Sequence, residues 1–341
     1  GRVYQYRKGN RDCCGAFLRH SKNVTLEGLH FAFMHGMGVL GQFTENITLR
    51  GVTIAPDPGS GRTCAAWADC THFSGCRGKI TLTGCVFSGA QDDACNVHGT
   101  YLRIVDQPDA DRIKVRFMHH QTYGFQAFFP GDQIEFVRAD AMAGYAAGRI
   151  KSVEVLDDYE QLLTLGAEAP GWRENDVVEN ITWAPEVKIT GCDVRRIPTR
   201  GLLISTRKKS LVSGCTFTRL WNGVHISADV GSWFESGPVR DVTIHCNRFA
   251  YCTKPAIEID PRNDAPNTAF HQNVRVEHNV FELTGDLPAL KARSTTGLVF
   301  SNNQLVCNPP RRADECVVTE QCERVTVEGN TPSPHAGDHS G

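Results

Sequence analysis

The sequence predicts an all-β protein: a right-handed parallel β-helix with an inserted small β-barrel module. A short alternating motif recurs at a step near 23 residues, the recurrence is interrupted once, and no convincing long amphipathic helix is found. Strand-rich rungs of about 20–30 residues are typical of a parallel β-helix. A β-sandwich is the alternative, but it would not predict recurrence at a fixed step.

The repeat begins with NVTLEGLHF at Asn23 and NITLRGVTI at Asn46, a step of 23 residues. Each copy is a short alternating strand, then Gly, Cys or Asn at a turn, then a second short strand. The step of 32 from Val242 to Val274 fits one rung with a longer loop. Further copies are KITLTGCVF at Lys79, VKITGCDV at Val187, SLVSGCTF at Ser210, VTIHCNRF at Val242, VRVEHNVF at Val274, LVFSNNQL at Leu298 and VTVEGN at Val325.

The interruption predicts an inserted module. The repeat is absent for the 107 residues from Ile80 to Val187, although one rung needs about 23. The gap contains the strand-like stretches YLRIV, RIKVRFM, DQIEFVR, RIKSVEVL, QLLTL and DVVENITW, which suggest a small barrel. The predicted organisation is β-helix over 1–100, barrel over 101–182, β-helix over 183–330 and a polar tail over 331–341. We expect the barrel to form a wall beside the residues that precede it.

The charge and the cysteine content of the chain argue against several classes of function. The chain has 36 basic and 38 acidic side chains, no Lys/Arg stripe that would indicate nucleic acid, and no apolar run long enough to span a membrane. No CxxC pair occurs among the 14 cysteines, so no metal or other cofactor is predicted. Cys85, Cys192, Cys215 and Cys246 recur at one point of the repeat, which favours buried small hydrophobes over a secreted disulfide framework.

The motif GAQDDACNVHG at Gly89–Gly99 places two carboxylates, Asp92 and Asp93, side by side. Asp69, in AAWADCTHFSG, lies 23 residues before Asp92, and strands one rung apart are about 4.8 Å apart. We therefore expect the three carboxylates to converge, with a turn or bulge turning Asp92 and Asp93 to one side. Crowding should raise at least one pKa, giving an acid for a leaving oxygen and a base for water, as in glycoside hydrolysis. The alternative is a solvated Asp-Asp turn.

Further candidates surround this motif. His98 would contact a sugar hydroxyl or orient a carboxylate, unless it is a turn residue. In SADVGSWFESGPVRDV, at Ser227–Val242, Trp233 would stack on a sugar while Asp229 and Glu235 accept its hydroxyl hydrogen bonds. The alternative is a hydrophobic staple under a loop. Arg200, in PTRGLLIST, would bind a hydroxyl or be an ordinary surface arginine.

At these residues the chain resembles glycoside hydrolase family 110, the α-1,3-galactosidases. The motifs are ADCTHFSGCRGKI at Ala68–Ile80, DDACNVHGTYL at Asp92–Leu102, TRGLLIST at Thr199–Thr206 and WFESGPVRDV at Trp233–Val242. The resemblance implies a β-helix with an inserted barrel and an inverting exo-hydrolase that releases terminal α-1,3-linked galactose from blood group B-like or linear α-galactosides. It implies Asp92 as general acid, with Asp69 and Asp93 holding the attacking water.

The resemblance also implies a secreted or periplasmic protein. The chain begins with Gly1 and has no signal-peptide pattern, so we expect that an N-terminal part is missing.

Two rival functions stay open. A polygalacturonase-like pectinase is also a β-helix with an Asp and an Asp-Asp pair, but its His-Gly comes a rung later, and both RIK copies here, at Arg112 and Arg149, fall in the insert. A non-catalytic glycan-binding β-helix, as in adhesins or tailspikes, would need no carboxylate trio.

Overall fold

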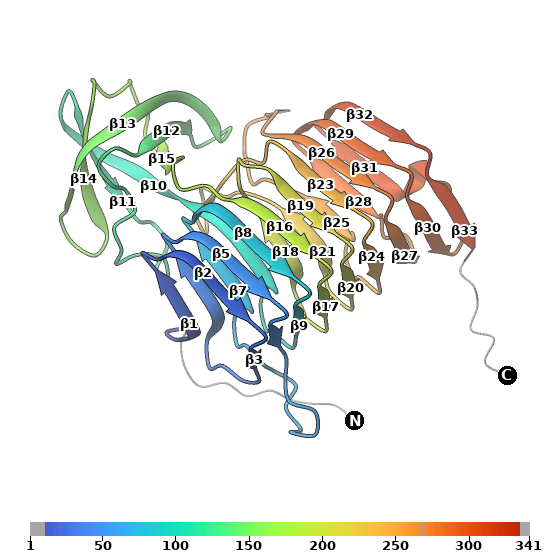
Figure 1. The fold of residues 1–341 in the computed structure, drawn as a ribbon. Coiled ribbons are helices and arrows are strands. Elements are labelled where there is room, and N and C mark those ends of the chain that lie inside the picture. Colours follow the sequence, from blue (N-terminus) through green and yellow to red (C-terminus); the bar gives the residue numbers. More distant parts are fainter. Residues whose placement is uncertain (1–10, 268, 335–341) are drawn as a thin grey trace.

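The protein is a parallel β-helix of three sheets with a β-barrel attached to one side, which confirms the predicted fold class (Figure 1). The computed structural model describes residues 11–267 and 269–334. Within these residues the one helix is a 3-10 turn, η1 (Asp314–Cys316). None of the described segments forms a helix of the length and apolarity needed to cross a membrane.

The nine predicted repeats form the nine strands of one parallel sheet. Ile47 is in register with Ile80, Ile80 with Val187 and Val242 with Val274, so the 107-residue gap and the 32-residue step each amount to one rung. The strands are β2 (Lys22–Glu27), β5 (Glu45–Arg50), β8 (Arg77–Thr83), β16 (Glu186–Thr190), β19 (Ser210–Ser213), β23 (Val242–His245), β26 (His271–Glu277), β29 (Thr295–Ser301) and β32 (Glu323–Glu328).

A left-handed turn residue follows each of these strands and starts the second strand of the rung. Gly191 and Gly214 have φ of 62° and 63°, a conformation that glycine adopts without a Cβ penalty. The second sheet contains β3 (His30–Phe31), β6 (Thr53–Ile54), β9 (Val86–Ser88), β17 (Asp193–Arg195), β20 (Thr216–Thr218), β24 (Arg248–Ala250), β27 (Val280–Thr284), β30 (Gln304–Asn308) and β33 (Thr331–Pro334). The first four residues of the predicted polar tail are therefore a strand, and residues 335–341 lie outside the described part of the chain.

From Val52 to Asn303, the residue after the turn forms a buried ladder through the helix. Cys85, Cys192 and Cys215 are buried in it, as predicted. Cys246 is exposed, contrary to the prediction, because it occupies the left-handed position with φ of 55°; Asn247 takes the buried place. From there the ladder continues as asparagines that bond to the neighbouring rungs, namely Asn247, Asn279, Asn303 and Asn330.

The third sheet of the helix is not marked by the repeat. Its strands are β1 (Cys14–Arg19), β4 (Met37–Gln42), β7 (Thr71–Ser74), β10 (Cys95–Asp109), β18 (Arg200–Ile204), β21 (Asn222–Ile226), β25 (Ile257–Ile259), β28 (Leu290–Arg293) and β31 (Val317–Glu320). Strand β7 pairs in parallel with β10, and β10 with β18. This sheet carries the candidate site.

The insert closes into an antiparallel barrel in which β10 is also a strand. The pairing runs β10–β11–β14–β13–β12–β15 and returns to β10. The added strands are β11 (Arg112–Arg116), β12 (Gln133–Arg138), β13 (Ala143–Val155), β14 (Glu160–Leu165) and β15 (Val177–Asn180). Each of the six predicted stretches overlaps one of these strands. Since β10 runs unbroken through residue 101, the limits at 101 and 182 stay a prediction.

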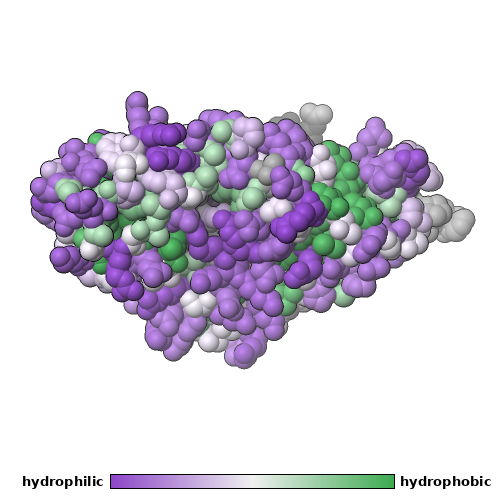
Figure 2. Space-filling view, turned by 90° about the horizontal axis from the view of Figure 1, so that it is seen from above, coloured by the Kyte–Doolittle hydropathy of each residue, from purple (hydrophilic) through white to green (hydrophobic). Residues whose placement is uncertain are grey.

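The helix interior is filled by columns of apolar side chains. Phe217, Phe249 and Phe281 stack with successive ring centroids 4.9 Å apart. Seen from above, the surface is mostly hydrophilic, with hydrophobic side chains gathered toward the C-terminal rungs (Figure 2). In the last described rung, Val325 and Val327 continue inner columns but are 37% and 39% exposed.

The asparagine ladder should contribute strongly to stability. Asn279 accepts hydrogen bonds from Asn247 and donates to Ile244 O and to Asn303 Oδ1, at 2.9–3.1 Å. Asn279→Ala should lower the free energy of unfolding by about 2–4 kcal/mol, because it leaves buried groups without partners. Urea unfolding followed by circular dichroism would measure this.

Asn302→Gly is the matched control for that change. Asn302 has φ of 54°, which glycine adopts at no cost, so stability should change by less than about 1 kcal/mol. Equal losses of unfolding free energy in the two variants would contradict a specific contribution of the asparagine ladder to stability.

Candidate active site

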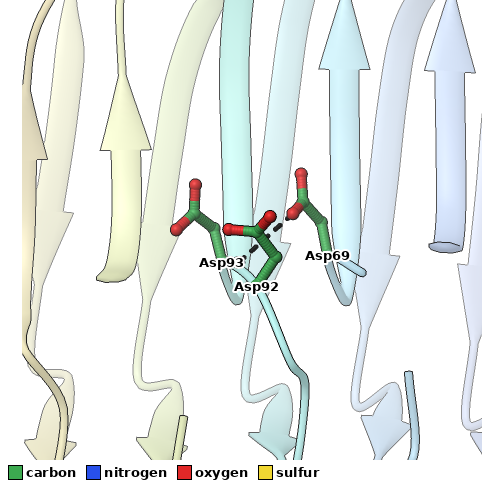
Figure 3. A group of neighbouring side chains, drawn as sticks. All are labelled: Asp69, Asp92 and Asp93. Atoms are coloured by element: carbon green, nitrogen blue, oxygen red, sulfur yellow. Dashed lines mark hydrogen bonds between the residues drawn. The ribbon is translucent and has the colours of Figure 1, made fainter. Parts of the chain in front are cut away.

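Asp69, Asp92 and Asp93, here called the Asp trio, lie together where β7 and β10 begin. Asp92 and Asp93 occupy a bend just before β10, so both carboxylates reach one side (Figure 3). Thr71 is in register with Cys95, which places Asp69 level with Asp93 at a step of 24 residues rather than with Asp92 at 23. The Asp93 N–H donates to Asp69 Oδ1 at 3.2 Å. One oxygen from each member lies within 4.8 Å of the others.

Two arginines neutralise part of this charge. Arg200 Nε donates to Asp93 Oδ1 at 2.6 Å, and its Nη2 lies 3.6 Å from Asp92 Oδ1. Arg11 Nη2 lies 2.7 Å from Asp92 Oδ2. Arg200 is therefore a counter-ion of the trio, and its contact with a sugar hydroxyl stays a prediction. The trio has a spacing that suits a shared cation, but guanidinium groups already pair with Asp92 and Asp93, and we assign no metal to it.

Burial raises two pKa values in the trio, as the crowding predicts. The pKa of Asp69 is raised well above its ordinary value, first by loss of water and then by the charges of Asp92 and Glu235. Burial also raises the pKa of Asp93 to about 8, although Arg200 opposes the change. Both carboxyl groups therefore hold protons at a pH where a solvated aspartate is ionised.

Two histidines connect Asp69 to the backbone. His72 Nδ1 lies 2.7 Å from Asp69 Oδ2, and His72 Nε2 lies 3.0 Å from His98 Nε2. His98 Nδ1 bonds to Gly99 O at 2.6 Å. Burial lowers the pKa of both rings. His98 thus reaches Asp69 only through His72, which the sequence analysis did not single out.

Glu235 enters the site from a distant loop. It begins β22 (Glu235–Ser236), which pairs antiparallel with β10, Gly99 opposite Ser236. Its Oε1 accepts from Asn96 Nδ2 at 3.1 Å and lies 3.5 Å from His98 Nε2. Burial opposes ionisation, but the charges of His98, His72 and Arg200 outweigh it and hold the pKa of Glu235 below its ordinary value.

Trp233 lines the cavity, whereas Asp229 does not. Trp233 is 39% exposed, and His119 of the barrel packs against it with ring centroids 4.1 Å apart. Asp229 Oδ1 accepts from the N–H groups of Gly231 and Ser232 at 2.7 and 2.6 Å, so it shapes its own loop. The structure therefore does not bring Asp229 into the cavity, and its contact with substrate stays a prediction.

The side chains enclose a cavity of about 260 Å³. Its size is near the lower end for ligand pockets, about 300–1,000 Å³, which suits one small polar ligand unit. A barrel loop covers one side with Gln121, Thr122, Tyr123 and Phe125, in agreement with the expected wall. Lining residues that the sequence analysis missed are Arg11, Met37, Leu40, Gln42, His72, Ser74, Asn96, Arg262 and those four loop residues. Of these, His72, Ser74 and Asn96 lie within the quoted site motifs, and closeness in the sequence to the aspartates was the one signal that could have indicated them.

The buried side chain of His225, on β21, should make the stability of the folded protein fall at acidic pH. Neither ring nitrogen has a hydrogen-bond partner within the described residues, and burial lowers its pKa to about 3, followed by repulsion from Arg200. Below pH 6.5 the unfolded histidine binds a proton that the folded one does not, so the wild type loses stability as pH falls. His225→Asn should therefore gain relative stability from pH 7 to pH 5, by up to about 1.4 kcal/mol per pH unit. Thermal unfolding at several pH values measures this, and a difference that is constant with pH would contradict it.

Sequence comparisons place both parts of the fold among known proteins. The family model described as "GLAA-B beta-barrel domain II" matches residues 112–178, and "Right handed beta helix region" matches residues 177–337. The second match agrees with the predicted handedness.

Three relatives carry the name alpha-1,3-galactosidase A. That of Akkermansia muciniphila is 45% identical over 85% of this chain and 51% of its own length. Those of Bacteroides thetaiotaomicron and Bacteroides fragilis are 38% and 44% identical, over 98% and 87% of this chain and 60% and 51% of their own lengths. The chain thus spans about half the length of the curated relatives it matches.

Proposed function

The chain is a homologue of the α-1,3-galactosidases, as its resemblance to glycoside hydrolase family 110 indicates, and from this premise we propose that it is an exo-acting, inverting glycoside hydrolase that releases terminal α-1,3-linked galactose. The observation that carries the proposal is the Asp trio, in which two buried members have raised pKa values, inside a cavity of about 260 Å³. A cavity of this size with one covered side suits a single terminal sugar. Blood group B-like and linear α-galactosides are the proposed substrates.

We assign Asp92 as general acid, and we assign to Asp69 and Asp93 the role of holding the attacking water. Asp92 has the most exposed carboxylate of the trio, with 17% of its side chain accessible against 5% and 1%, so it is the one that a leaving oxygen can reach. Arg11 Nη2 lies 2.7 Å from Asp92 Oδ2, so substrate must displace that contact before a leaving oxygen can reach this carboxylate oxygen.

Inversion requires room for a water between acid and base. Opposed carboxyl groups lie about 6.5–9.5 Å apart in inverting enzymes and about 5–5.5 Å apart in retaining ones. Because oxygens of the Asp trio lie within 4.8 Å, Asp92 must turn away from Asp69 when substrate binds. Inversion therefore rests on the resemblance and on this movement, and retention is the alternative outcome.

Single Asp→Asn substitutions in the Asp trio should distinguish the general acid from the residues that hold the water. Asp92→Asn should abolish galactose release from α-1,3-galactosyl glycans but spare an activated aryl α-galactoside at least about tenfold more, because a good leaving group needs little protonation. Asp69→Asn and Asp93→Asn should impair both substrates alike. Galactose release measured for each pair provides the test.

Asp241→Asn, at a 40% exposed carboxylate outside the cavity, is the control and should leave both rates unchanged. If Asp93→Asn instead spares the aryl substrate, the acid is Asp93. Turnover of polygalacturonate without any galactose release would favour the pectinase, and glycan binding without turnover the binding module.

The first anomer released decides the stereochemistry. Proton NMR of the first-formed sugar should show β-galactose from an α-linked substrate, before mutarotation mixes the anomers. Initial α-galactose would mean retention and a carboxylate nucleophile, and the water-holding roles would be wrong.

A further inference from the structure

A buried hydrogen-bond chain begins at Asp69, whereas the two arginines pair with Asp92 and Asp93. It runs from Asp69 Oδ2 to His72 Nδ1 at 2.7 Å, from His72 Nε2 to His98 Nε2 at 3.0 Å, and from His98 Nδ1 to Gly99 O at 2.6 Å. The side chains of His72 and His98 are 14% and 4% exposed. Water therefore has little access to replace any link.

The end of this chain fixes the number of its protons. A backbone carbonyl can only accept, so His98 Nδ1 carries a proton. The link between the two Nε2 atoms needs one proton, since two bare nitrogens would repel at 3.0 Å. The link between His72 Nδ1 and Asp69 Oδ2 needs another. The chain therefore holds three protons, one more than two neutral imidazoles and an ionised carboxylate would hold.

The charges that face the chain require this extra proton. Apart from the chain, the Asp trio holds one proton, on Asp93 in the unliganded site and on Asp92 when it acts as the acid. Without the extra proton on the chain, the other two members and Glu235 would then carry three negative charges. Arg11, which binds Asp92, and Arg200, which binds Asp92 and Asp93, supply two positive charges. A proton on His72 supplies the third, so the buried group becomes neutral as a whole. Asn96 adds no charge.

The extra proton can lie on the Asp69 carboxyl or on His72 Nδ1, and the two forms differ chemically. Burial raises the pKa of Asp69 and lowers that of His72, so in the unliganded site the proton favours the carboxyl. In that form Asp69 cannot accept a proton from water. Transfer of the proton along this 2.7 Å hydrogen bond to Nδ1 leaves an ionised Asp69 beside an imidazolium without changing the net charge.

We propose that His72 is a positioning residue that takes the proton from Asp69 Oδ2 and so frees this carboxylate to act on the attacking water. The inference rests on the proposed function. The water loses one proton to Asp69 as its oxygen bonds to the anomeric carbon. The glycosidic bond breaks, and its oxygen takes the proton of Asp92. One proton then returns from the Asp69–His72 pair to Asp92 through solvent, which restores the starting state.

The test is the pH dependence of kcat/KM in His72→Asn. The asparagine Nδ2 takes the place of Nδ1 and still donates to Asp69, but it cannot accept a proton. Asp69 then stays protonated up to its raised pKa. The acidic limb of the profile, where kcat/KM falls as pH is lowered, should therefore move to higher pH by about 1–3 units, which is the effect of losing a nearby opposite charge. Activity should fall at least about tenfold on the acidic side and recover at alkaline pH.

His225→Asn is the matched control, because it makes the same change on the same sheet outside the cavity and should leave the limb in place. A loss in His72→Asn that is equal at all pH values, or an unchanged profile, overturns the proposal.

A second measurement does not depend on activity. In ¹⁵N-histidine spectra, Asp69→Asn should shift the His72 Nδ1 resonance more than that of any other histidine, and an unmoved resonance overturns the proposed proton link. A wild type that releases no galactose refutes the proposed function alone, and the spectra still decide whether Asp69 and His72 share a proton.

Discussion

The parallel pairing of β7 with β10 is the constraint on which the site depends. It holds Asp69 and Asp93 one strand spacing apart, about 4.8 Å, and bonds the backbone of one to the carboxylate of the other. Two buried like charges at this distance cannot both ionise readily. The next rung relieves part of the repulsion by placing Arg200 level with Asp93. Burial is the larger cause of the raised pKa values of Asp69 and Asp93, so both stay raised although Arg200 opposes the change at Asp93.

The sequence predicted the first sheet of the helix and the barrel strands but not the third sheet. The first strands end at a left-handed residue such as Gly191 or Gly214, so alternation and turn recur together. In the third sheet a left-handed residue follows some strands, such as β1 and β4, but none follows β18, β21 or β25. Alternation and turn therefore do not recur together in this sheet, and no common motif marks its strands.

The site was predictable to the extent that it follows the rung spacing. Convergence of Asp69 with the Asp-Asp pair came from spacing alone, although the register is 24 rather than 23. Arg11 and His72 reach the trio through side-chain conformations that no spacing encodes. Asp229 and Glu235 are six residues apart in one loop, and only the pairing of β22 with β10 determines that Glu235 enters the cavity.

The barrel is inserted without disturbing this register. Ile80 pairs with Val187, Val86 with Asp193 and Cys95 with Leu202, so the offset across the insert is 107 residues in all three sheets. A slip of one residue in β18 would replace Arg200 by a neighbour at the Asp trio and turn its side chains to the other face. The two connections between the barrel and the helix must therefore position the chain so that the residues after the insert pair in the same register. This constraint explains how an insert can supply a wall to the cavity while the residues after it still supply the counter-ion.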